Sequence, residues 1–114
     1  MSEKTLRQAK VFYQDQFAGT LTETEHGYSF VYDTEYLKEG KAISITLPLQ
    51  VESFESEKLF LFFQGLLPEG WYLDIVRETA KIDRKDLFGL LLATGQDTIG
   101  AVTVIEDKEV SRHD

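Results

Sequence analysis

The apolar residues of this chain change their spacing about half-way along the sequence. In the first half they recur at every second position, as in the segment 9–14, where Ala9, Val11 and Tyr13 alternate with the residues between them. A period of two is typical of a β-strand with one buried face. Strands are therefore predicted at residues 9–14, 17–24, 28–32 and 43–48. We expect turns at 15–16 and 25–27, and a short helical turn closed by glycine at 36–40.

The second half has helical features instead. Three helices are predicted there, with Ser56, Pro68 and Asp83 at their starts and Gly65, Lys81 and Gly95 at or near their ends. Asp86 stands three residues after Asp83, which suits a capping box. A last strand is predicted at 100–106. The expected fold is α+β, a small antiparallel β-sheet with about three packed α-helices.

The length of 114 residues fits one domain, which we expect to span residues 7–106. The polar segments 1–6 and 107–114 lack periodicity and are expected to be flexible tails. A hydrophobic fraction of 42% argues against disorder, because a chain of this composition can bury a core.

The net charge of -8 argues against direct binding to nucleic acid, whose phosphates attract Lys and Arg. Acidity suits a basic protein partner, although it also serves solubility alone.

The chain contains no cysteine, and its N-terminus has no apolar stretch typical of a signal peptide. The longest apolar run, 59–63, is far too short to cross a membrane. We therefore expect a cytoplasmic protein.

The sequence offers no catalytic constellation. His26 and His113 stand in polar surroundings without a recognisable partner, so both are expected to be solvated. The glycines of segment 95–100 do not make a phosphate-binding loop, because Ala101 and Val102 follow where Lys and Ser or Thr would be needed. The H-R-D and D-F-G signatures of kinases are absent. We predict a non-enzyme without cofactor or metal.

Several short motifs occur in an order that is familiar from one family. They are Val11-Phe12-Tyr13, Gly19-Thr20-Leu21, Phe30-Val31-Tyr32-Asp33, Tyr36-Leu37, Ser44 with Leu47-Pro48-Leu49, Phe62-Phe63, Leu66-Leu67-Pro68, Gly95-Gln96-Asp97 and Gly100-Ala101-Val102. In this order the chain resembles the N-terminal small subdomain of the HipA family, the Ser/Thr kinase toxins of bacterial toxin–antitoxin systems. The chain looks like one subdomain of such a kinase, made as a separate protein.

The resemblance implies a function through a partner. A free-standing copy would bind a HipA-like kinase whose own chain lacks this subdomain, and would act as its antitoxin by inhibiting it. A HipB-like DNA-binding protein could join the complex without this chain touching DNA. Three alternatives stay open: a subunit that completes and permits kinase activity, an N-terminal fragment of a full-length HipA-like kinase, and a ligand-binding module unrelated to kinases.

Trp71 is the predicted anchor for the partner. In a helix beginning near Pro68, the apolar residues Tyr72, Leu73, Val76 and Ala80 gather on one stripe. Trp71 falls roughly 140° from the centre of that stripe, and tryptophan is enriched among residues that dominate binding energy. If a loop or another helix covers it, Trp71 belongs to the core instead. The predicted partner-binding residues are Pro68, Glu69, Gly70, Trp71, Asp74, Ile75, Gln96 and Asp97.

Overall fold

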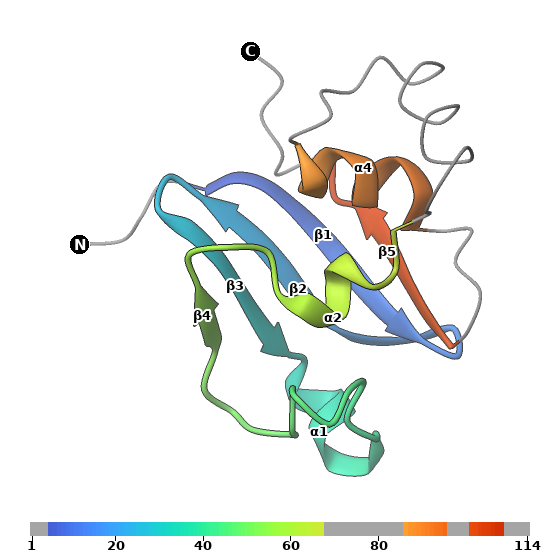
Figure 1. The fold of residues 1–114 in the computed structure, drawn as a ribbon. Coiled ribbons are helices and arrows are strands. Elements are labelled where there is room, and N and C mark those ends of the chain that lie inside the picture. The colour runs from blue at the N-terminus through green and yellow to red at the C-terminus, as the bar shows by residue number, and fades with distance from the viewer. Residues whose placement is uncertain (1–4, 68–85, 96–100, 109–114) are drawn as a thin grey trace.

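The computed structural model describes residues 5–67, 86–95 and 101–108, which form an antiparallel sheet covered on one side by helices (Figure 1). The strands are β1 (Thr5–Tyr13), β2 (Gln16–Thr24), β3 (Gly27–Tyr32), β4 (Phe54–Ser56) and β5 (Val102–Glu106). The helices are α1 (Thr34–Glu39), α2 (Leu61–Gln64) and α4 (Leu87–Thr94). The five-stranded sheet has the order β4-β3-β2-β1-β5. The predicted α+β fold is confirmed.

The first two hairpins follow from local sequence. Gln14 and Asp15 join β1 to β2 with φ values of 48° and 67°, and a turn with both central residues in the left-handed region suits the twist of a hairpin. Asp33 then caps α1, because its side chain accepts hydrogen bonds from the backbone of Glu35 and Tyr36, each at 3.2 Å. The α1 helix closes at Gly40, as predicted.

The fourth strand does not lie where the alternation predicts it. Residues 43–48 form a tight turn with a single bridge between Ser44 and Leu47, and the strand next to β3 is β4, at Phe54–Ser56. The prediction was wrong because the two isoleucines do not share a face: Ile43 is buried, whereas Ile45 is exposed. The chain reverses between them.

Two helix starts were also predicted too early. Ser56 ends β4 instead of capping a helix, and α2 begins only at Leu61 because Phe60 has an extended backbone (ψ 139°). The α4 helix is capped by Asp86, not Asp83, and the Asp86 carboxylate accepts from the backbone N–H of Gly89 at 3.0 Å. The predicted helix from Pro68 to Lys81 lies outside the described residues.

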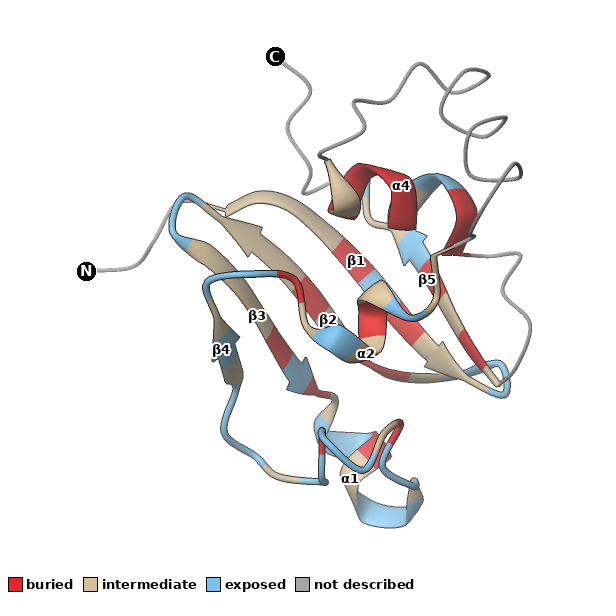
Figure 2. Cartoon of the chain, viewed as in Figure 1, coloured by how far each residue is buried: buried red, intermediate tan, exposed pale blue. Residues whose placement is uncertain are grey.

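The core lies between the sheet and helices α2 and α4 (Figure 2). Its centre is the ring of Phe30, whose centroid is 4.9 Å from that of Tyr32 and 5.7 Å from that of Phe63 on α2. A Cβ at Gly19 would lie 2.4 Å from the carbonyl oxygen of Val31, so only glycine allows β2 and the Phe30 ring to approach this closely. Each large buried side chain contributes about 1.5–3 kcal/mol to folding.

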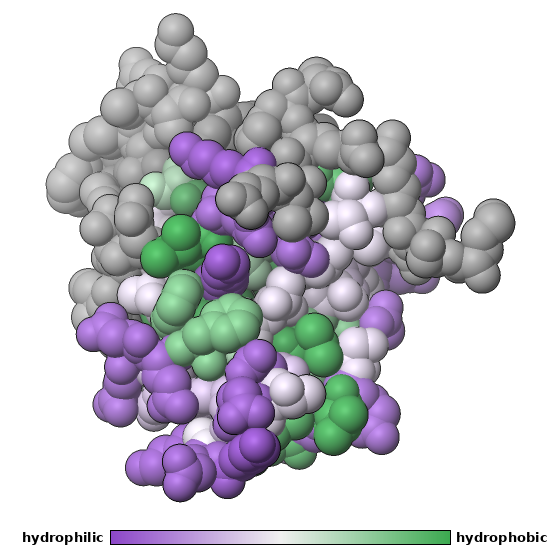
Figure 3. Space-filling view, turned by 180° about the vertical axis from the view of Figure 1, so that it is seen from behind, coloured by the Kyte–Doolittle hydropathy of each residue, from purple (hydrophilic) through white to green (hydrophobic). Residues whose placement is uncertain are grey.

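The other face of the sheet carries no helix among the described residues. Strand pairing aligns Val31, Thr20, Lys10 and Ile105 in one row across β3, β2, β1 and β5. Figure 3 shows the molecule from the side opposite to that of Figure 1, and hydrophilic and hydrophobic side chains are interspersed there. Within the part of the chain that the structure describes, no helix has the length and apolarity that a membrane crossing requires.

Candidate interaction surface

A tight turn after α1 presents the most exposed large apolar side chain of the described residues. Ile45 is 99% exposed at its tip, whereas Ile43 and Leu47 on either side are buried. The backbone N–H of Leu47 donates to the carbonyl of Ser44 at 3.0 Å. The Ser44 hydroxyl accepts from the backbone N–H of Thr46 at 3.2 Å and lies 2.9 Å from the Thr46 hydroxyl. The turn therefore has a defined conformation with Ile45 directed into solvent.

The hydroxyl of Tyr32 attaches both ends of this turn to the core. It accepts from the backbone N–H of Ile43 at 3.0 Å and donates to the carbonyl oxygen of Leu47. The Tyr32 ring is itself buried and stacks on Tyr36, with centroids 6.0 Å apart and an interplanar angle of 4°. Burial raises the pKa of Tyr32, so its hydroxyl stays protonated and can donate at neutral pH.

The turn belongs to a segment without charge. Residues 42–51 (AISITLPLQV) contain no Asp, Glu, Lys or Arg, although 28% of the whole chain is charged. Leu49 and Val51 in the same segment are 39% and 71% exposed. Exposed apolar residues in an uncharged stretch are typical of the centre of a protein–protein interface, from which charged residues are depleted. We call residues 42–51 the apolar loop.

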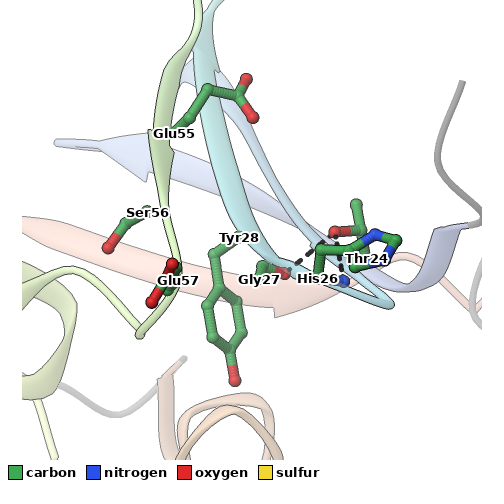
Figure 4. Close-up of a pocket in the computed structure, with 7 residues that line it drawn as sticks. All are labelled: Thr24, His26, Gly27, Tyr28, Glu55, Ser56 and Glu57. Carbon is green, nitrogen blue, oxygen red and sulfur yellow. Dashed lines mark hydrogen bonds between the residues drawn. The ribbon is translucent and has the colours of Figure 1, made fainter.

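An acidic segment, residues 52–57, follows the apolar loop and includes β4 at the edge of the sheet. Glu52, Glu55 and Glu57 are all exposed. An open pocket of about 270 Å³ lies where β4 meets the β2–β3 hairpin, lined by Thr24, His26, Gly27, Tyr28, Glu55, Ser56 and Glu57 (Figure 4). Glu55 and Tyr28 point to opposite sides of the sheet, so the polar groups of the pocket do not converge on one point. Among the described residues, no cluster of three or more His, Asp or Glu could hold a metal.

The strongest ion pairs are structural. Arg7 donates to Glu23 at 2.6 and 2.9 Å and to Asp86 at 2.7 and 2.9 Å, and its guanidinium lies 5.2 Å from the centre of the Phe88 ring. Hydrogen bonding to Arg7 lowers the pKa of Asp86, and both carboxylates raise the pKa of Arg7. This cluster joins β1, β2 and the start of α4. It therefore fixes α4 against the sheet and leaves no free group for chemistry.

Both the sequence and the fold of this chain match a known protein family. The family model of the HipA N-terminal domain matches residues 9–105. The chain belongs to the HipA N-terminal domain family. Its sheet and helices superpose on a solved structure described as the N-terminal domain of HipA toxin, with a TM-score of 0.71 and 32% identity, covering 90% of this chain and 93% of that one.

Relatives of this HipA N-terminal domain protein differ greatly in length. An uncharacterized protein of Haemophilus influenzae is 36% identical over 104 residues, which cover 91% of this chain and 96% of that protein. The Serine/threonine-protein kinase toxin HipA of Shewanella oneidensis is 29% identical over 82 residues, which cover 72% of this chain but only 19% of the toxin. A solved complex of S. oneidensis HipA with HipB and operator DNA contains a chain that matches with a TM-score of 0.72 and 25% identity, over 85% of this chain and 23% of that one.

The predicted partner-binding residues of this HipA N-terminal domain protein all lie outside the described residues. They fall in the segments 68–85 and 96–100, so their role stays a prediction. His26 is exposed, as expected. Sequence reasoning missed Ile45, because the alternation of 43–48 suggested a strand. The signal that could have found it is the uncharged stretch, together with Ser44 and Thr46, whose hydroxyls favour turns.

Proposed function

We propose that this chain is an antitoxin subunit that binds and neutralises a HipA-like Ser/Thr kinase toxin lacking the N-terminal subdomain. One observation carries the proposal: the same domain accounts for 96% of a small H. influenzae protein and for only 19% of a kinase toxin. A domain that occurs both inside a kinase and alone can occupy its usual place on a kinase chain that lacks it. In this proposal the partner carries out the phosphoryl transfer, which fits a sequence without the H-R-D and D-F-G kinase signatures.

Inhibition is the favoured consequence of binding. A toxin needs a restraint, and a separate subunit supplies one by mass action, since the ratio of bound to unbound kinase rises in proportion to the free concentration of the subunit. Further parts of the proposal are a cytoplasmic location and a ternary complex with a HipB-like DNA-binding protein. In that complex the net charge of -8 would keep this chain away from DNA itself. The sequence-based anchor, Trp71, is proposed as one contact with the kinase.

A growth assay tests the proposal. The chain would be co-expressed with a HipA-like kinase whose own sequence lacks this subdomain, and growth would be compared with that of cells expressing the kinase alone. The antitoxin role predicts rescued growth, and co-purification of the two chains. Toxicity that appears only with both chains would identify a permissive subunit instead. Full toxicity with no complex would refute both roles. Trp71→Ala should abolish rescue without lowering the melting temperature if Trp71 is the anchor.

A further inference from the structure

We propose that the apolar loop docks into the kinase, with Ile45 entering an apolar pocket of the partner that is flanked by basic side chains. The inference rests on the proposed function and adds a surface to it. It concerns residues 42–51, whereas the sequence-based anchor Trp71 lies in another segment.

Ile45 serves no purpose in the fold of the described residues. A side chain that is 99% exposed contributes almost nothing to core packing. The structure nevertheless holds it in one place. The hydrogen bonds within the turn fix its shape, and the buried hydroxyl of Tyr32 binds the backbone of Ile43 and Leu47 on either side. A backbone that is already fixed loses little conformational freedom on binding, which favours an efficient anchor.

The charges around the loop also favour a protein partner. Phe54, at the start of β4, contacts the same Tyr32 ring that holds the turn, with centroids 6.4 Å apart. The start of β4 is therefore a neighbour of the apolar loop in space as well as in sequence. Glu52 and Glu55 are exposed after the uncharged centre, and the exposed Lys41 stands before it. This is the arrangement of an interface with an apolar centre and a charged rim. On the side that faces Glu52 and Glu55, the complementary partner carries Lys or Arg beside an apolar pocket.

The same charges argue against a second copy of this chain as the occupant. Packing two apolar loops together would bring the glutamates of both copies close to each other. Like charges at an interface are unfavourable, and each chain carries a net charge of -8. A partner of opposite charge avoids this repulsion, so we assign the loop to the kinase.

A matched pair of isoleucine variants tests the inference. Ile45→Ser removes the proposed anchor. Ile105→Ser makes the same change on β5, at the opposite edge of the sheet from β4, where Ile105 is 44% exposed. Affinity for the purified kinase would be measured by calorimetry. Burying one isoleucine side chain corresponds to a factor of roughly 10 to 150 in affinity. We expect a loss of that size for Ile45→Ser, little change for Ile105→Ser, and retained binding for Ile45→Val.

The outcomes separate this inference from the proposed function. If the wild-type chain binds the kinase and Ile45→Ser binds equally well, the docking surface is wrong while the antitoxin role stands. If the wild-type chain does not bind, both are wrong. Thermal melting is expected to give the same temperature for Ile45→Ser and wild type. Light scattering that shows a wild-type dimer lost in Ile45→Ser would overturn the inference in favour of a second copy.

The exposed glutamates beside the apolar loop lead to a further prediction for the same complex. Replacing Glu52 and Glu55 together by Gln should slow association and make the association rate less dependent on salt, because rim charges act mainly on the rate of encounter. Stopped-flow measurements at two salt concentrations would show this. An unchanged association rate and salt dependence would refute a basic rim on the partner.

Discussion

The substitution Tyr32→Phe removes one hydroxyl oxygen and should make the turn around Ile45 less ordered. In Tyr32→Phe the buried ring keeps its contacts with Phe30 and Tyr36, but the hydroxyl that binds Ile43 and Leu47 is lost. The variant therefore changes hydrogen bonding with little change in packing. Both backbone groups belong to buried residues, so their loss of a partner is costly.

The expected cost follows from the two hydrogen bonds. Each buried hydrogen bond contributes about 0.5–1.5 kcal/mol, so Tyr32→Phe should lower the free energy of unfolding by about 1–3 kcal/mol. For a domain of this size each kcal/mol corresponds to roughly 4 °C in Tm, which gives a decrease of about 4–12 °C. The backbone amide of Ile43 should also exchange its hydrogen faster, because its acceptor has gone.

Chemical denaturation, thermal melting and hydrogen exchange would measure these effects together. Tyr13→Phe is the matched control: Tyr13 packs against the same core, and its hydroxyl makes no hydrogen bond to any residue that the structure describes. An unchanged Tm for Tyr32→Phe, together with unchanged protection of the Ile43 amide, would refute the claim that this hydroxyl holds the turn.

Other substitutions test the parts of the fold that position this surface. Asp86→Asn should cost about 1–3 kcal/mol at neutral pH by weakening the bond with Arg7. Because the folded pKa of Asp86 is lowered, the wild-type advantage should be full above the ordinary value of 3.8 and shrink as the pH falls below it, as measured by denaturation at several pH values. Gly19→Ala should cost about 1–3 kcal/mol, since its Cβ would meet the Val31 carbonyl at 2.4 Å; normal stability would contradict this close approach. Asp33→Ala should cost about 1 kcal/mol through loss of the α1 cap, whereas Asp33→Asn should be nearly neutral in the same melts.

The hairpins could be predicted from the sequence because their information is local. In β1, β2 and β3, alternation and turn residues lie within a few positions of one another, so pattern and structure agree. The order of the HipA-like motifs indicated the family, and the family match over residues 9–105 confirms that resemblance.

The errors occur where distant contacts decide the local structure. Ile43 and Ile45 alternate like strand residues. The hydroxyl of Tyr32, on β3, however, forms hydrogen bonds to the backbone of Ile43 and Leu47, and these bonds stabilise a turn between them. Leu59 and Phe60 have helical spacing with their neighbours, yet α2 begins only at Leu61, after Phe60 joins the core in an extended conformation. The local sequence pattern does not reveal the hydrogen bonds of Tyr32 or the packing of Phe60 against the core. The candidate surface was missed for the same reason, because Ile45 was assigned to a strand.

A kinetic titration tests most directly whether this chain restrains a kinase. A purified HipA-like kinase lacking the N-terminal subdomain would be mixed with increasing amounts of this chain, and its autophosphorylation rate would be followed with radiolabelled ATP. The antitoxin role predicts that the rate falls with concentration and reaches a plateau, and that Ile45→Ser shifts the titration to roughly 10- to 150-fold higher concentration. A rate that stays constant, or rises, as the wild-type chain is added would contradict it.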